Sequence, residues 1–142
     1  MKRLFNVRGS LIVAGLMMTL LGLGNILGAE DWAADQWVGA QGRELDIATG
    51  LEWAWGAKIA TVGLMILILS FVLYGAARAR FGAIAISTFV LGEIFTVSAL
   101  SSKNYGEDAS IPLLLVVVPI LVLLIALVSC IMNWNDADEN GL

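Results

Sequence analysis

The sequence contains no histidine and a single cysteine, Cys130. Histidine is the usual axial ligand of haem, the commonest protein ligand of zinc and copper, and the most frequent general base. One cysteine alone forms neither an intrachain disulfide nor a CxxC motif or cysteine cluster. We therefore expect no metal site, no cofactor bound by this chain alone, and no enzymatic activity.

Charged residues are also scarce. They make up 14% of the 142 residues, whereas 59% are hydrophobic, and the mean hydropathy is +0.88. Soluble domains are typically about 25% charged and about 45–50% apolar. The formal net charge of −4 offers no basic stripe for nucleic acid. The composition indicates an integral membrane protein with one membrane domain, residues 1–142, and no separate soluble domain.

Four apolar stretches are long enough to cross a membrane, which takes about 20 helical residues. They are residues 11–28, 56–77, 82–101 and 112–133. The third is the least hydrophobic, so we expect its neighbours to shield it from lipid. The fourth is dominated by Leu, Val and Ile without a stripe of small residues, and we expect it to face lipid or a partner. The predicted fold class is all-α, a four-helix transmembrane bundle.

The charges at the ends of these spans are asymmetric. Basic residues precede the first span and fill the expected turn between the second and third: Lys2, Arg3, Arg8, Arg78 and Arg80. The other two loops are mainly acidic. The positive-inside rule then places both termini in the cytoplasm, including the acidic tail 134–142, and we expect a bacterial inner membrane. The first apolar run is long for a signal peptide, so we expect it to stay as an anchor.

The outer loop, residues 29–55, is rich in tryptophan. With the tryptophan after the fourth span, five are expected at headgroup depth or at a partner: Trp32, Trp37, Trp53, Trp55 and Trp134. The spacing of Leu45, Ala48, Leu51 and Trp55 predicts a short amphipathic helix on the outer surface. The loop is either a lid or docking surface, or an aromatic belt with a solvated acidic face. We favour the belt.

Small residues in the first three spans predict close helix packing, since they let backbones approach in lipid. The residues expected to pack are Gly15, Gly22, Gly24, Gly28, Gly63 and Gly92. Gly24 and Gly28 form a GxxxG pair, which is a weak signal for a dimer, so packing within the bundle is the favoured interpretation. Pro119, near the middle of the fourth span, predicts a bend in that helix.

Glu93 is the one acidic residue within the predicted spans. Lys58 stands at the outer end of the antiparallel second span, within reach of Glu93, and Thr61, Thr96 and Asn25 are further candidates for a polar cluster. Three interpretations remain open. Glu93 is a structural residue paired with Lys58, or it faces a partner subunit or a quinone-like ligand, or it binds a proton or cation in transport. We favour the first.

Two segments give the chain a family resemblance. GLMMTLLGLGNILG (residues 15–28), followed by a long outer loop, and AARARFGA (residues 76–83), between the second and third spans, resemble the DoxX-type family of small four-helix membrane proteins. The resemblance implies a four-helix membrane fold and a loose link to quinone-coupled redox complexes. It carries no catalytic residue over to this chain.

The sequence leaves three functions open. The favoured one is a non-catalytic accessory or structural subunit of a larger membrane complex, redox-linked (respiratory or photosynthetic) only as far as the resemblance implies. Its partner subunits are expected to contact the fourth span, the outer loop and the acidic tail. The first alternative is a small ion- or proton-coupled transporter using Glu93. The second is a stand-alone homo-oligomer that binds a partner through its Trp-rich outer loop.

Overall fold

The computed structural model describes residues 6–102 and 113–135. These residues form five helices and no strand: α1 (Val7–Leu27), α2 (Ala29–Gln36), α3 (Arg43–Val72), α4 (Gly75–Ser101) and α5 (Leu113–Met132). The predicted all-helical fold with four membrane-length helices is confirmed, since α1, α3, α4 and α5 are long and apolar enough to span a membrane. The acidic tail beyond residue 135 and the loop before α5 lie outside the described residues.

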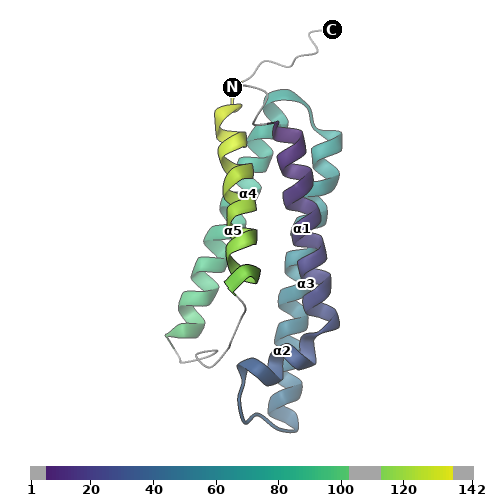
Figure 1. The fold of residues 1–142 in the computed structure, drawn as a ribbon, viewed down its shortest axis with the longest axis vertical. Coiled ribbons are helices and arrows are strands. Elements are labelled where there is room, and N and C mark those ends of the chain that lie inside the picture. Colours follow the sequence, from purple (N-terminus) through teal and green to yellow (C-terminus); the bar gives the residue numbers. More distant parts are fainter. Residues whose placement is uncertain (1–5, 103–112, 136–142) are drawn as a thin grey trace.

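The long helices alternate in direction, so their ends gather at two levels (Figure 1). The start of α1, the α3–α4 turn and the end of α5 lie at one level, which we call the turn end. The short helix α2 and the first turns of α3 lie at the other, which we call the α2 end. Only one residue, Gly28, separates α1 from α2.

The turn between the second and third spans is shorter than predicted. Helix α3 ends at Val72, two extended residues follow, and α4 begins at Gly75, whose φ of +48° is a conformation that glycine adopts without strain. The prediction that Arg78 and Arg80 fill this turn is therefore wrong. Both lie in the first turns of α4, because Gly75 completes the reversal before them.

The predicted surface helix is also misplaced. The residues from Leu45 to Trp55 belong to α3, which runs without a break from Arg43 into the membrane-length segment. A short helix does lie between the first two spans, but it is α2. The physical reason is the helical periodicity of α3. Ala48, Glu52 and Gly56 are buried at intervals of four residues, so the spacing that predicted a surface helix in the loop continues the buried face of the membrane-length segment.

Helices α1 and α3 pack backbone to backbone along their length. A Cβ atom added to Gly15 would lie 2.7 Å from the backbone nitrogen of Leu67, and one added to Gly56 would lie 2.7 Å from the carbonyl oxygen of Gly22. A Cβ on Gly63 would lie 2.7 Å from Cβ of Met18. These positions have no room for a side chain. Close approach of small residues is how helices gain packing energy in lipid, where no hydrophobic effect draws them together.

The other glycines expected to pack helices do not do so. No atom lies within 4 Å of a Cβ added to Gly24 or to Gly92, so the prediction is wrong for both residues. Gly28 lies against the indole of Trp32 rather than against a neighbouring long helix. Among the described residues, neither glycine of the GxxxG pair packs against a neighbouring long helix.

Helix α5 packs through small residues, contrary to the prediction that it lacks them. Leu123, Ala126, Ser129 and Cys130 are buried on one face. A Cβ on Gly82 of α4 would lie 2.7 Å from the sulfur of Cys130, so the two helices touch closely here. The spacing of three and four residues between these small side chains was hidden by the surrounding Leu, Val and Ile. Helix α5 stays helical on both sides of Pro119.

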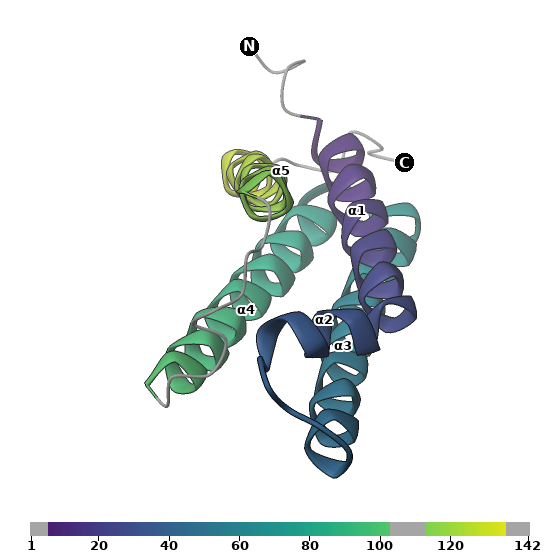
Figure 2. The same cartoon turned by 60° about the horizontal axis from the view of Figure 1, so that its bottom comes forward.

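Helix α4 is the least covered of the four long helices, which makes the prediction of a shielded third span wrong for the single chain. Only 11% of its apolar segment is buried, against 28% for α1. Its buried residues, Ala79, Gly82, Ala83 and Ile86, all lie towards the turn end. Beyond them α4 diverges from α3 and α5 (Figure 2). The small residues of α4 that contact neighbouring helices closely lie only in its first half. At the α2 end, α4 therefore stands apart from α3 and α5.

Candidate polar site between α3 and α4

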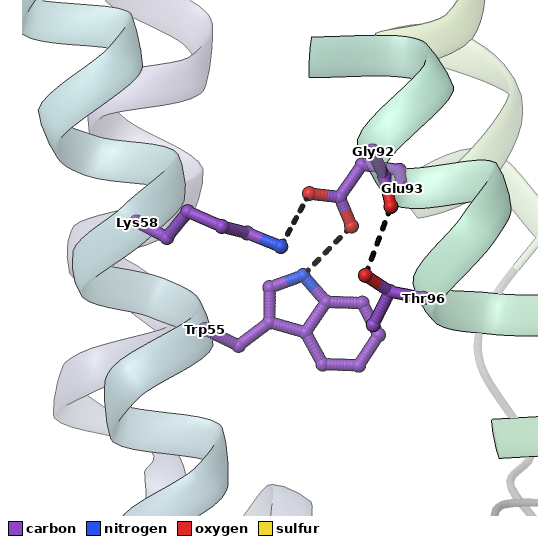
Figure 3. A network of polar contacts seen from close by, with 5 residues as sticks. All are labelled: Trp55, Lys58, Gly92, Glu93 and Thr96. Carbon is purple, nitrogen blue, oxygen red and sulfur yellow. Dashed lines mark hydrogen bonds and ion pairs between the residues drawn. The ribbon is translucent and has the colours of Figure 1, made fainter. Parts of the chain in front are cut away.

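The carboxylate of Glu93 joins α4 to α3 across the opening between them. Nζ of Lys58 lies 2.7 Å from Oε1 of Glu93, and Nε1 of Trp55 donates to Oε2 at 3.0 Å. Figure 3 shows both side chains reaching from α3 toward the same carboxyl group. Residues three apart share a helix face, which is why α3 presents both donors to one acid. Each carboxylate oxygen thus has its own partner.

The pair is only partly shielded. The side chain of Glu93 is 20% exposed and that of Lys58 is 43% exposed. The ammonium also lies 5.3 Å from the centroid of the Trp55 ring, so the indole contacts the cation as well as the anion. An acid at membrane depth is costly unless it is paired, and here a cation and an N–H donor together offset that cost.

The other members of the predicted cluster do not bind Glu93. The hydroxyl of Thr96 donates to the carbonyl of Gly92 at 2.9 Å, beside the acid but not to it. Thr61 is exposed on α3. Asn25 lies on α1 and donates elsewhere, to Glu52. The structure thus brings Lys58 and Glu93 together, places Thr96 next to them, and leaves Thr61 and Asn25 outside the contact.

A second polar contact ties α1 to α3. Nδ2 of Asn25 donates to the backbone carbonyl of Glu52 at 2.7 Å and to Oε2 of the same residue at 3.3 Å. Glu52 is only 4% exposed. Sequence reasoning missed Glu52, because it was counted among the acids of the outer loop. The four-residue intervals from Ala48 through Glu52 to Gly56 were the available signal, since they place Glu52 on the face that packs against α1.

Three of the five tryptophans expected at the interface lie near helix ends, and a fourth, Trp53, lies within α3. Trp32 is in α2, Trp37 follows its last residue, Trp53 is exposed in the first half of α3, and Trp134 follows α5. The carbonyl of Trp134 accepts a hydrogen bond from Nε of Arg80 at 3.2 Å, which joins the start of α4 to the end of α5. Trp55 differs, because its indole is engaged with Glu93 between two helices.

Opposite charges gather at opposite ends of the described chain. Arg8 lies over the ring of Phe71, with Cζ 5.0 Å from the centroid, and Nε of Arg78 donates to the carbonyl of Leu73 at 2.7 Å. Together with Arg80 they place three guanidinium groups at the turn end. The first turns of α2 and α3, at the other end, carry Glu30, Asp31, Glu44 and Asp46. The molecule therefore has a basic and an acidic pole.

A cavity of about 310 Å³ opens at the α2 end between α2, α3 and α4. Its lining includes Trp37, Glu52, Trp55, Lys58, Thr96 and Leu100. Most of its surface is apolar, and its lining includes one lysine and one glutamate. Among residues 6–102 and 113–135, no group of three or more acidic or cysteine side chains is placed to hold a metal ion.

No protein-family model, no curated protein and no solved structure matches this chain. The resemblance to DoxX-type proteins therefore has no support from a family match. The fold class and the candidate site depend on the residues and contacts described above.

Proposed function

We propose that this chain is a non-catalytic accessory subunit of a larger membrane protein complex, and that the second half of α4 contacts a transmembrane helix of a partner subunit. The observation that supports this most is the divergence of α4 from α3 and α5 toward the α2 end (Figure 2). There one side of α4 is half-buried and the rest of the helix is exposed, with Leu91 66% and Phe95 77% exposed.

The chemistry of this part of α4 favours a helix as the occupant. Gly92 has open space where a Cβ would lie, and Thr88 and Ser98 are exposed among apolar residues. Lipid tails cannot hydrogen-bond a hydroxyl group and gain nothing from a glycine. A second helix can approach closely at glycine and can accept hydrogen bonds from hydroxyl groups. The proposal does not extend to a redox-linked complex, since that expectation depended on the resemblance alone.

We also propose an orientation. Arg8, Arg78 and Arg80 at the turn end support a cytoplasmic position for that end, following the positive-inside rule. Helix α2 and the acidic first turns of α3 then face the outside of a bacterial inner membrane. This arrangement puts the chain's termini in the cytoplasm and the cavity on the outer side.

A proton- or ion-coupled transporter is the second candidate, because the cavity reaches Lys58, the partner of Glu93. Glu93 is already engaged, with Oε1 in an ion pair with Lys58 and Oε2 accepting from Trp55, which favours a structural role. Proton and sodium flux into proteoliposomes separates the two candidates. Flux that disappears in Glu93→Gln would support the transporter, and the absence of flux in the wild type supports the subunit.

Site-specific photo-crosslinking at native expression level tests the subunit. A photoreactive residue replaces Phe95 of α4 or, as a control, Leu20 of α1, which is also exposed but on another helix. We expect Phe95 to crosslink to one defined foreign chain that also co-purifies in mild detergent, and Leu20 to give no adduct with it. Adducts only between copies of this chain would support the homo-oligomer. Absence of any protein adduct at Phe95 would contradict the proposal.

A further inference from the structure

The cavity at the α2 end contains charges of both signs within an apolar wall. The Lys58 ammonium has three N–H donors and forms an ion pair with Glu93 at 2.7 Å, and its side chain is 43% exposed. Glu52 contributes a buried carboxylate on the same helix, held by Asn25. The indoles of Trp37 and Trp55 and the side chain of Leu100 supply apolar surface.

The position of the cavity limits what can enter it. Lys58 lies 14 residues before the end of α3 at Val72, which is about 21 Å at 1.5 Å per residue. The hydrocarbon core is about 30 Å thick, so the Lys58 backbone lies below its outer boundary and the cavity, on the α2 side, reaches headgroup depth. A volume of about 310 Å³ is at the small end of ligand cavities. It can take a polar headgroup but not two acyl chains.

From these features we propose that the cavity binds the headgroup of a zwitterionic phospholipid with a primary ammonium, a phosphoethanolamine lipid. The phosphate accepts hydrogen bonds from the remaining N–H groups of Lys58, and the lipid ammonium donates to the carboxylate of Glu52. The acyl chains leave the cavity and extend into the surrounding bilayer. This site requires only the membrane location and is independent of the partner subunit.

The charge balance argues against an anionic lipid. Two carboxylates, Glu52 and Glu93, lie near one ammonium, Lys58, so a ligand with a net negative charge is repelled by the surplus acid. A zwitterionic headgroup can place its phosphate near the ammonium of Lys58 and its own ammonium near the carboxylate of Glu52. A phosphocholine headgroup has the same net charge but no N–H to donate, which makes it the matched comparison.

Native mass spectrometry of the full chain released from nanodiscs tests this site. The nanodiscs contain equal parts of phosphatidylethanolamine, phosphatidylcholine and phosphatidylglycerol. We expect the wild type to retain phosphatidylethanolamine about tenfold more than phosphatidylglycerol, with phosphatidylcholine between them. Soluble glycerophosphoethanolamine, added at millimolar concentration, should not displace the lipid, because it lacks the acyl chains that anchor the lipid in the bilayer. Displacement by it would show a soluble-phosphate site and overturn the lipid proposal, as would equal retention of all three lipids.

Two variants locate the preference in the cavity. Glu52→Gln removes the partner of the lipid ammonium, and Leu100→Trp fills the cavity from α4 without touching Asn25 or Glu93. Each should abolish the preference for phosphatidylethanolamine, whereas Glu44→Gln, an exposed acid outside the cavity, should keep it. A preference that survives Leu100→Trp would overturn the proposal even if Glu52→Gln fails to fold. If Glu52→Gln folds and still prefers phosphatidylethanolamine, the proposal is overturned as well.

Discussion

The indole nitrogen of Trp55 lies 3.0 Å from Oε2 of Glu93, on the carboxylate whose other oxygen is 2.7 Å from Lys58. Two side chains of α3 therefore hold one side chain of α4, at the level where α4 diverges from its neighbours (Figure 3). Because α3 and α4 touch closely only near the turn end, this contact is a brace across an otherwise open gap. We expect its contribution to the free energy of unfolding to be measurable.

We expect Lys58→Met and Glu93→Gln to be coupled in a double-mutant cycle. The coupling energy should be about 0.5–1.5 kcal/mol, because the pair is partly exposed and hydrogen bonds at membrane depth are modest in value. Trp55→Phe should cost a similar amount by removing one N–H donor. The measurement is the free energy of unfolding in mixed micelles, with Glu44→Gln as the neutral control. Strictly additive energies would show that Lys58 and Glu93 do not interact.

Gly22→Ala and Gly63→Ala should destabilise the protein by about 1–3 kcal/mol each, the usual range for overpacking. A Cβ atom at Gly22 meets the backbone of Ala60, and neither helix can shift without disturbing the whole α1–α3 contact. Gly24→Ala is the matched control, two residues from Gly22 but facing open space. Alanine is the better helix former, so this control should be neutral or stabilising by up to about 1 kcal/mol. Thermal unfolding in detergent measures the difference, and equal effects at Gly22 and Gly24 would contradict the described packing.

Asn25→Leu should destabilise the protein by about 1–3 kcal/mol. This change keeps the size of the side chain but removes the donor to the Glu52 carbonyl and carboxylate, leaving buried acceptors without it. Thr61→Val serves as the control, since Thr61 is exposed although it was grouped with Asn25 by sequence. Unfolding free energies of the two variants are compared under the same conditions. A larger loss of stability for Thr61→Val than for Asn25→Leu would contradict the described contact between Asn25 and Glu52.

Maleimide labelling tests the proposed orientation. In a Cys130→Ala background, Asp35→Cys at the α2 end should react with a membrane-impermeant maleimide in intact spheroplasts. Asn135→Cys, at the turn end, should react only after the membrane is opened. Both positions are exposed, so a difference in labelling reports the side of the membrane rather than burial. The reverse labelling pattern would show that the α2 end is cytoplasmic and the turn end lies outside.

Hydropathy and charge alone predicted much of this molecule. Four helices of membrane length follow from the apolar runs, since an apolar segment in lipid must satisfy its backbone hydrogen bonds internally. The pairing of Lys58 with Glu93 was also within reach, because antiparallel helices and a long lysine side chain permit few other partners. Composition, however, says nothing about which face of each helix meets which neighbour.

That choice depended on contacts between residues distant in the sequence. Trp55 and Glu52 were assigned to an outer loop, but both belong to α3. There Trp55 donates to Glu93 and Glu52 accepts from Asn25. The least hydrophobic span was expected to be the most covered, yet α4 is the most exposed, because its small residues near Gly82 allow close packing at one end only. Gly22 and Gly24 are equally small, and only the geometry of α1 against α3 leaves one without space and the other free.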